Sequence, residues 1–145
     1  MANKKIIKFE IVTPERIVFQ EEIFQVTVPT EEGDITVLPE HTPLISNLKP
    51  GVLEIVKSDG EASVMSVAGG FVEVLLDKVV ILADAAERAE EIDISRAEEA
   101  KSRAEESLKN LRSEDRERFA EISAQLERAL ARTRSAKRWK NIKGM

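Results

Sequence analysis

The hydrophobic periodicity of this chain changes once, close to Asp84, and this change constrains the fold more than any other feature. Before Asp84, short alternating runs of apolar residues are separated by Gly, Pro and Asp, as in β-strands joined by tight turns. After it, apolar residues recur at spacings of three and four, as in amphipathic helices. We therefore expect an α+β fold with segregated parts: an antiparallel β-sandwich or flattened barrel over residues 1–84, then a two-helix hairpin over 85–145, with a hinge at about 84–93.

The pattern of residues 1–84 predicts roughly eight to ten short strands. No stretch of helical period interrupts these strands, which argues against a parallel α/β sheet. In the run from Ile23 to Pro29, the residues Phe24, Val26 and Val28 fall on one face. The run Glu40 to Pro50, punctuated by prolines, predicts a loop or single turn. The clearest predicted strands are 4–12, 16–20, 23–29, 35–38, 52–56, 62–68, 71–76 and 79–83.

Two glycines interrupt the strand pattern at Gly69-Gly70. The dipeptide is too short for a phosphate-binding loop and is flanked by strand-like residues on both sides. We predict a tight hairpin corner there, because glycine accepts the positive φ angles that such corners require.

The second part predicts two helices joined by a short turn. Asp93 is the expected N-cap of a first helix, and Ser95 with Glu98 offers an overlapping capping box. This helix is expected to run to about Leu111. A break follows at 112–115, with Ser113 as the next cap. The face of the second helix, which is expected to run to about residue 139, carries Phe119, Ile122, Leu126, Ala129, Leu130 and Thr133.

The expected contact between the two helices is mostly alanine. Burying one methyl contributes about 0.8 kcal/mol, whereas ordering a residue costs about 1–2 kcal/mol. We therefore expect the hairpin to be marginal alone and to need the sandwich, a ligand or a partner. Elements of low stability are the ones that move.

Composition excludes several classes of site. The chain has no cysteine, so disulfides, thiolate nucleophiles and cysteine zinc sites are excluded, and its one histidine, His41, excludes multi-histidine metal sites. No apolar run approaches the ~20 residues that span a bilayer, and the N-terminus lacks a signal-peptide pattern. No nucleophile–base set stands out, so a small hydrolase built on the sandwich is the weakest hypothesis.

Charge is distributed unevenly. Residues 1–84 carry 7 basic and 14 acidic side chains, residues 85–145 carry 15 and 13, and the stretch from Arg128 onward has seven basic residues and no acid. This basic end has three interpretations: a nucleic-acid contact with Trp139 for stacking, a solvated helix C-terminus whose cations suit the dipole, or a contact with an acidic protein. A basic-armed nucleic-acid or protein adaptor is the alternative function.

Asp93 and Arg96 lie three apart at the predicted helix start. They are either an N-cap with a surface ion pair, or a polar anchor for a nucleotide, because free N–H groups at a helix start attract anions. In a hairpin that turns near 112–115, position 96 is expected opposite 131, close to Arg128 and Arg132. With Arg103, these arginines could hold phosphates bidentately.

Three stretches give the chain a resemblance to a known family. These are GDITVLPEHTPLISNLKPG at 33–51, VAGGFVEV at 67–74, and IDISRA opening the helical part at 92–97. They are similar to the GD-x-x-x-LP-x-H-x-P, V-x-GGF-x-EV and I-D-x-x-R-A patterns of the epsilon subunit of the F-type ATP synthase. The resemblance covers essentially the whole chain.

The resemblance implies a non-catalytic rotor subunit of a bacterial proton- or sodium-translocating ATP synthase, peripheral on the cytoplasmic face of the cell membrane. Residues 1–84 would contact the gamma subunit and the c-ring. The helices would inhibit ATP hydrolysis when extended toward the alpha and beta subunits. It implies no catalytic residue, no metal, no required cofactor, no nucleic acid and no direct insertion into the bilayer.

The resemblance further implies ATP as a regulatory ligand of the folded hairpin. The intact I-D-x-x-R-A pattern places ligands on Ile92, Asp93, Arg96 and Ala97. Further ligands would fall on Glu87, Arg103, Arg128 and Arg132.

Overall fold

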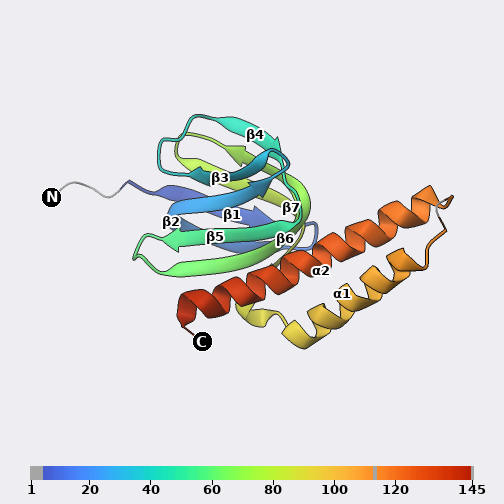
Figure 1. The fold of residues 1–145 in the computed structure, drawn as a ribbon. Helices are drawn as coiled ribbons and strands as arrows, with labels where there is room; N and C mark the ends of the chain where they lie inside the picture. Colours follow the sequence, from blue (N-terminus) through green and yellow to red (C-terminus); the bar gives the residue numbers. More distant parts are fainter. Residues whose placement is uncertain (1–4, 113, 145) are drawn as a thin grey trace.

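The computed structural model describes residues 5–112 and 114–144, and it confirms a β-sandwich followed by two helices (Figure 1). The last strand leads through a single 3₁₀ turn, η1, into the helical part. The elements are β1 (Ile7–Val12), β2 (Ile17–Thr30), β3 (Gly33–Val37), β4 (Leu44–Asn47), β5 (Gly51–Lys57), β6 (Ala62–Val74), β7 (Lys78–Arg88), η1 (Ala89–Glu91), α1 (Ile94–Lys109) and α2 (Arg116–Lys143).

The strands close into a flattened barrel. The hydrogen-bonded order is β1-β7-β6-β5-β2-β3, and β1 also pairs with β2, while β4 pairs with β6. Most pairs are antiparallel, but β1 and β7 run parallel. The long strand β2 makes the closure, because it pairs with β1 along its first half and with β3 and β5 along its second.

Long strands replace several of the predicted short ones. The predicted strands 16–20 and 23–29 form one strand, β2, and the predicted strands 62–68 and 71–76 form one strand, β6. The predicted loop at 40–50 contains β4, which pairs with the end of β6. The loop prediction was wrong because a strand of four residues, such as β4, gains its hydrogen bonds from a partner distant in sequence.

The predicted hairpin corner at Gly69-Gly70 is also wrong, because both glycines lie inside β6. They have the expected positive φ angles, 68° and 105°. Here the two residues bend a continuous strand. A side chain at Gly70 would collide with the carbonyl oxygen of Leu82 on β7, so the close approach of two strands requires glycine.

The core cluster of the barrel consists of apolar side chains from strands far apart in sequence. Phe9 and Phe19 pack with ring centroids 5.7 Å apart at 58°. Val26 and Val28 are buried as predicted, but Phe24 is exposed. The register of β2 against β5 shifts between Ile23 and Gln25, and this irregularity turns Phe24 outward.

Sheet structure continues past the predicted end of the last strand. The prediction ended it at Ala83, but β7 runs to Arg88. Residues 85–88, which the prediction placed in the hinge, therefore pair with β6. The guanidinium of Arg88 lies 5.3 Å from the centroid of the Phe19 ring, a cation–π contact at the strand end.

The second helix lies between the sandwich and the first helix (Figure 1). Asp93 caps α1 as predicted, accepting a hydrogen bond from the Arg96 backbone N–H at 3.2 Å. Asp115 caps α2 in the same way, at 3.1 Å. The predicted cap Ser113 lies outside the described residues. Gly144 ends α2 with a φ of 72°.

Candidate functional site

The helical hairpin, defined here as α1, α2 and their connection, contains a groove between its two helices. The groove has a volume of about 510 Å³. Its polar rim includes Arg103 from α1 and Arg128 and Arg132 from α2, and its other lining residues are Ala100, Ala104, Ser107, Gln125 and Ala129. Three guanidinium groups around small side chains make a cavity suited to an anion.

A second cavity of about 200 Å³ lies where α2 meets the sandwich. Arg128 and Arg132 border it too, so the two arginines connect the cavities. Its sheet side consists of Ser66, Ala68, Ala85, Ala86 and Glu87. The small residues at the end of β7 leave this space open.

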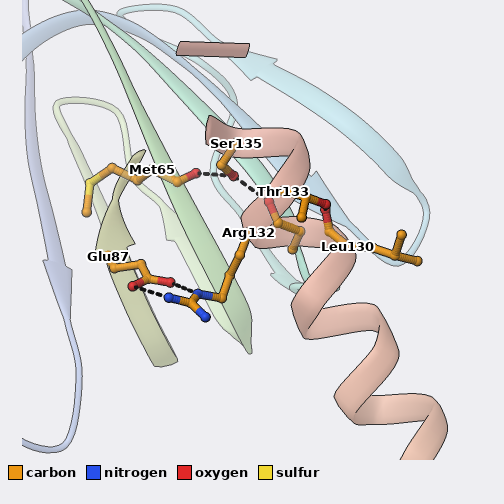
Figure 2. Close-up of polar contacts among 7 residues, drawn as sticks. Met65, Glu87, Leu130, Arg132, Thr133 and Ser135 are labelled. Atoms are coloured by element: carbon orange, nitrogen blue, oxygen red, sulfur yellow. Dashed lines mark hydrogen bonds and ion pairs between the residues drawn. The ribbon is translucent and has the colours of Figure 1, made fainter. Parts of the chain in front are cut away.

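Glu87 and Arg132 form an ion pair between β7 and α2, shown in Figure 2. Both carboxylate oxygens are engaged: one accepts from Nε, and the other accepts from Nη2 at 3.5 Å. Each side chain is 35% accessible, so a ligand could reach the pair. A phosphate that binds Arg132 would compete with Glu87.

The hairpin register differs from the prediction. Position 96 was expected opposite 131, but Ala97 packs in one cluster with Ala136, and Glu98 pairs with Lys137 at 3.3 Å. The reason is length: α2 has 28 residues and α1 has 16, so the first turns of α2 extend past the end of α1 (Figure 1).

This register divides the predicted ligand residues into two groups. Glu87, Arg103, Arg128 and Arg132 lie around the connected cavities. The turn that contains Asp93 lies further along the hairpin, because Ala97 and Ala104 are separated by seven helical residues, or about 10 Å.

The residues of the Asp93 turn have clear structural roles. The carboxylate of Asp93 caps α1, so the capping interpretation is confirmed, while nucleotide binding there stays a prediction. Ile92 and Ala97 are buried and pack against Ala136. The Arg96 side chain is exposed.

Sequence reasoning missed some residues that line the groove. Gln125 and Ser107 are the clearest cases. Helical spacing could have found both, since Gln125 lies three residues before Arg128, and Ser107 lies four after Arg103.

The outer face of the sandwich carries exposed apolar side chains. Phe71 and Leu82 are direct cross-strand partners and are 42% and 41% exposed. Ile45 on the neighbouring β4 is 72% exposed. We call these three residues the apolar face. Clustered exposed apolar side chains mark contact surfaces.

Other candidate features have local explanations. The Nδ1 atom of His41 donates to the carbonyl oxygen of the adjacent Thr42 at 2.7 Å. Among residues 5–112 and 114–144, no group of three or more His, Cys, Asp and Glu side chains is placed to hold a metal. None of the helices described is long and apolar enough to cross a membrane.

Comparisons with known proteins cover almost the whole chain. Residues 6–89 match the family described as ATP synthase, Delta/Epsilon chain, beta-sandwich domain, and residues 90–137 match its long alpha-helix domain. An ATP synthase epsilon chain from Herpetosiphon aurantiacus is 45% identical over 135 residues, covering 93% of this chain and 97% of that one. A Desulforudis audaxviator epsilon chain is 56% identical over 101 residues, covering 70% and 73%.

The fold is similar to that of subunits in solved assemblies. A chain in the Euglena gracilis mitochondrial ATP synthase, in a structure of OSCP, F1 and c-ring, superposes with a TM-score of 0.78 at 25% identity, covering 90% of this chain and 81% of that one. A chain of the Tetrahymena thermophila mitochondrial ATP synthase central stalk and c-ring gives 0.61 at 15% identity, covering 91% and 99%.

Proposed function

The chain belongs to the delta/epsilon family of ATP synthase subunits, and on this premise we propose that it is a non-catalytic rotor subunit whose hairpin regulates ATP hydrolysis. In this proposal the sandwich links the gamma subunit to the c-ring on the cytoplasmic face of a bacterial membrane. The hairpin inhibits hydrolysis when it extends toward the alpha and beta subunits. ATP stabilises the folded hairpin.

The apolar face supports attachment to a protein of the rotor. Ile45, Phe71 and Leu82 come from three adjacent strands: Phe71 and Leu82 lie directly opposite one another, and Ile45 lies opposite Glu73, two residues from Phe71 on β6. The similar Euglena chain was solved in an assembly that contains the c-ring. Burial of this face by gamma would remove these apolar side chains from water.

The weak contact between the helices supports a mobile hairpin. Its buried side chains are mainly alanines, at 97, 104, 129 and 136. Each contributes little burial. A small difference in binding energy is therefore enough to shift the hairpin between folded and extended forms.

The arginine cluster carries the proposal of ATP binding. Arg103 comes from α1, and Arg128 and Arg132 come from α2, so a polyphosphate bound there would contact both helices. Such a ligand binds only the folded hairpin and stabilises it. The nucleoside would extend toward the Asp93 turn, about 10 Å along α1, which an extended nucleoside triphosphate can span.

Calorimetric titration of the full chain with ATP tests this site. We expect binding that weakens from ATP to ADP to AMP, because the arginines contact the phosphates. Arg128→Ala with Arg132→Ala should weaken it by on the order of tenfold or more. Asp93→Ala with Arg96→Ala should also weaken it, because in this proposal the nucleoside contacts that turn.

Arg134→Ala is the matched control, since Arg134 is an exposed arginine of the same helix. It should bind ATP like the unmodified chain. Absence of binding heat at millimolar ATP, or equal binding by all variants, would contradict the proposed site.

A further inference from the structure

Small buried side chains of α2 lie at its contact with the sandwich. Ser135 faces β6, and Ala131, one helical turn before it, is also buried. The hydroxyl of Ser135 donates to the carbonyl oxygen of Ala131 within its own helix at 2.7 Å, and its contact with the Met65 carbonyl oxygen on β6 is longer, 3.4 Å (Figure 2). A contact made of small side chains permits α2 to slide along the sheet or to separate from it.

Two ion pairs lie at either side of this contact of small side chains. Arg132 pairs with Glu87 of β7, and Arg138 pairs with Glu54 of β5. In the second pair, Nε and Nη2 of Arg138 donate to the two carboxylate oxygens of Glu54, the latter at 3.4 Å. Six helical residues, or about 9 Å, separate the two arginines, so together they define the register of α2 on the sheet.

The two pairs differ in what a ligand does to them. Arg132 lines both cavities of the candidate site, so a bound phosphate competes with Glu87 for its guanidinium. Arg138 lies almost two turns further along the helix, and its partner belongs to a different strand. The hydrogen bonds and charge of Glu54 raise the pKa of Arg138, consistent with a favourable ion pair.

We propose that Glu54 and Arg138, here called the docking pair, hold the hairpin on the sandwich independently of any nucleotide. The docking pair sets the fraction of folded hairpins before a ligand binds, and ATP acts on that fraction. Because both side chains are partly exposed, salt screens the docking pair and releases the hairpin. This inference rests on the proposed function in one respect: release of the hairpin is taken to regulate ATP hydrolysis.

The test measures hairpin release in the full chain without nucleotide. The chain has no cysteine, so Asp59→Cys on the sandwich and Lys109→Cys at the end of α1 allow attachment of a fluorescent donor and acceptor. Energy transfer is followed through a urea titration, which brings the folded-to-released ratio into the measurable range. Circular dichroism checks that each variant retains its helices and strands.

Glu54→Gln and Arg138→Gln should each lower the folded-to-released ratio roughly two- to fivefold. The exchanged pair, Glu54→Arg with Arg138→Glu, should recover most of the loss. Each single variant should also show a weaker dependence of release on salt. Glu22→Gln and Arg134→Gln remove the same charges from exposed positions and serve as matched controls.

Unchanged ratios in both single variants, equal losses in the controls, or no recovery in the exchanged pair would overturn the proposal. The readout contains no ATP, so it stands apart from the calorimetric test. If the chain does not bind ATP but the docking-pair variants release the hairpin as expected, only the proposed nucleotide site is refuted. If the chain binds ATP but the docking-pair variants leave hairpin release unchanged, only the docking pair is refuted.

Discussion

The sandwich and the helical hairpin bury their surfaces in different ways. In the sandwich, large side chains such as Phe9, Leu53 and Ile55 are completely buried between strands distant in sequence. In the hairpin, the buried residues are mainly alanines on neighbouring helices. A buried Leu or Phe contributes about 1.5–3 kcal/mol, against about 0.8 kcal/mol per methyl, so the same number of residues stabilises the sandwich far more.

Polar contacts follow the same division. The strands are joined by backbone ladders, as in the nine residue pairs between β6 and β7. Besides a contact of small buried side chains, the Glu87–Arg132 and Glu54–Arg138 ion pairs join the hairpin to the sandwich, and their side chains remain accessible. Ladders are stable to salt, whereas accessible ion pairs are screened. A rigid base and a releasable hairpin are the result.

Deleting residues 89–145 gives the largest expected effect, because it removes the hairpin and leaves every strand. In the assembled ATP synthase, we expect several-fold faster ATP hydrolysis with the subunit still bound through the sandwich. ATPase assays of the complex and its subunit composition measure both results. Unchanged hydrolysis, including after activation, would contradict the regulatory role of the hairpin.

The variants Leu53→Ala and Ala104→Gly compare how much the sandwich core and the contact between the helices stabilise the protein. The side chain of Leu53 is fully buried in β5, so we expect a loss of about 2–5 kcal/mol in the free energy of unfolding. Ala104→Gly, at the contact between the helices, should cost about 1 kcal/mol and affect mainly the hairpin. Urea titrations followed by circular dichroism measure both losses. Equal losses from both variants would contradict the division.

The two helix caps provide the smallest and most closely matched comparison. Asp93 and Asp115 accept the same hydrogen bond, at 3.2 and 3.1 Å. Asp93→Ala and Asp115→Ala should each destabilise the hairpin by about 0.5–2 kcal/mol. If Asp93 also binds nucleotide, only its variant loses additional ATP affinity beyond the shared loss in stability. Equal ATP affinity in the two variants would limit Asp93 to capping.

Several features were predictable from local sequence. The change of period near Asp84 identified the two parts, and the capping role of Asp93 followed from its place before a helical pattern. Gly69-Gly70 shows where local reasoning failed. Positive φ angles serve a hairpin corner and a bend within a strand equally well, and only the pairing of β6 with both β5 and β7 separates them.

The candidate site shows the same limit. Clustering of Arg128 and Arg132 followed from their spacing of one helical turn. Their neighbours along α1 did not, because the predicted register assumed helices of matched length. Since α2 extends past the end of α1, the arginines lie beside Arg103 and Ala104, while Ala97 lies beside Ala136.

The sequence by itself determined the kind of each part, because hydrophobic period, caps and turn residues act over a few neighbouring positions. It fixed a strand-rich base, two helices and a set of arginines on the second part. Tertiary structure alone decided the closure of β1 against β7, the register of the hairpin, and the partners of Arg132 and Arg138. These contacts join residues up to 84 positions apart, and packing of whole elements sets such distances.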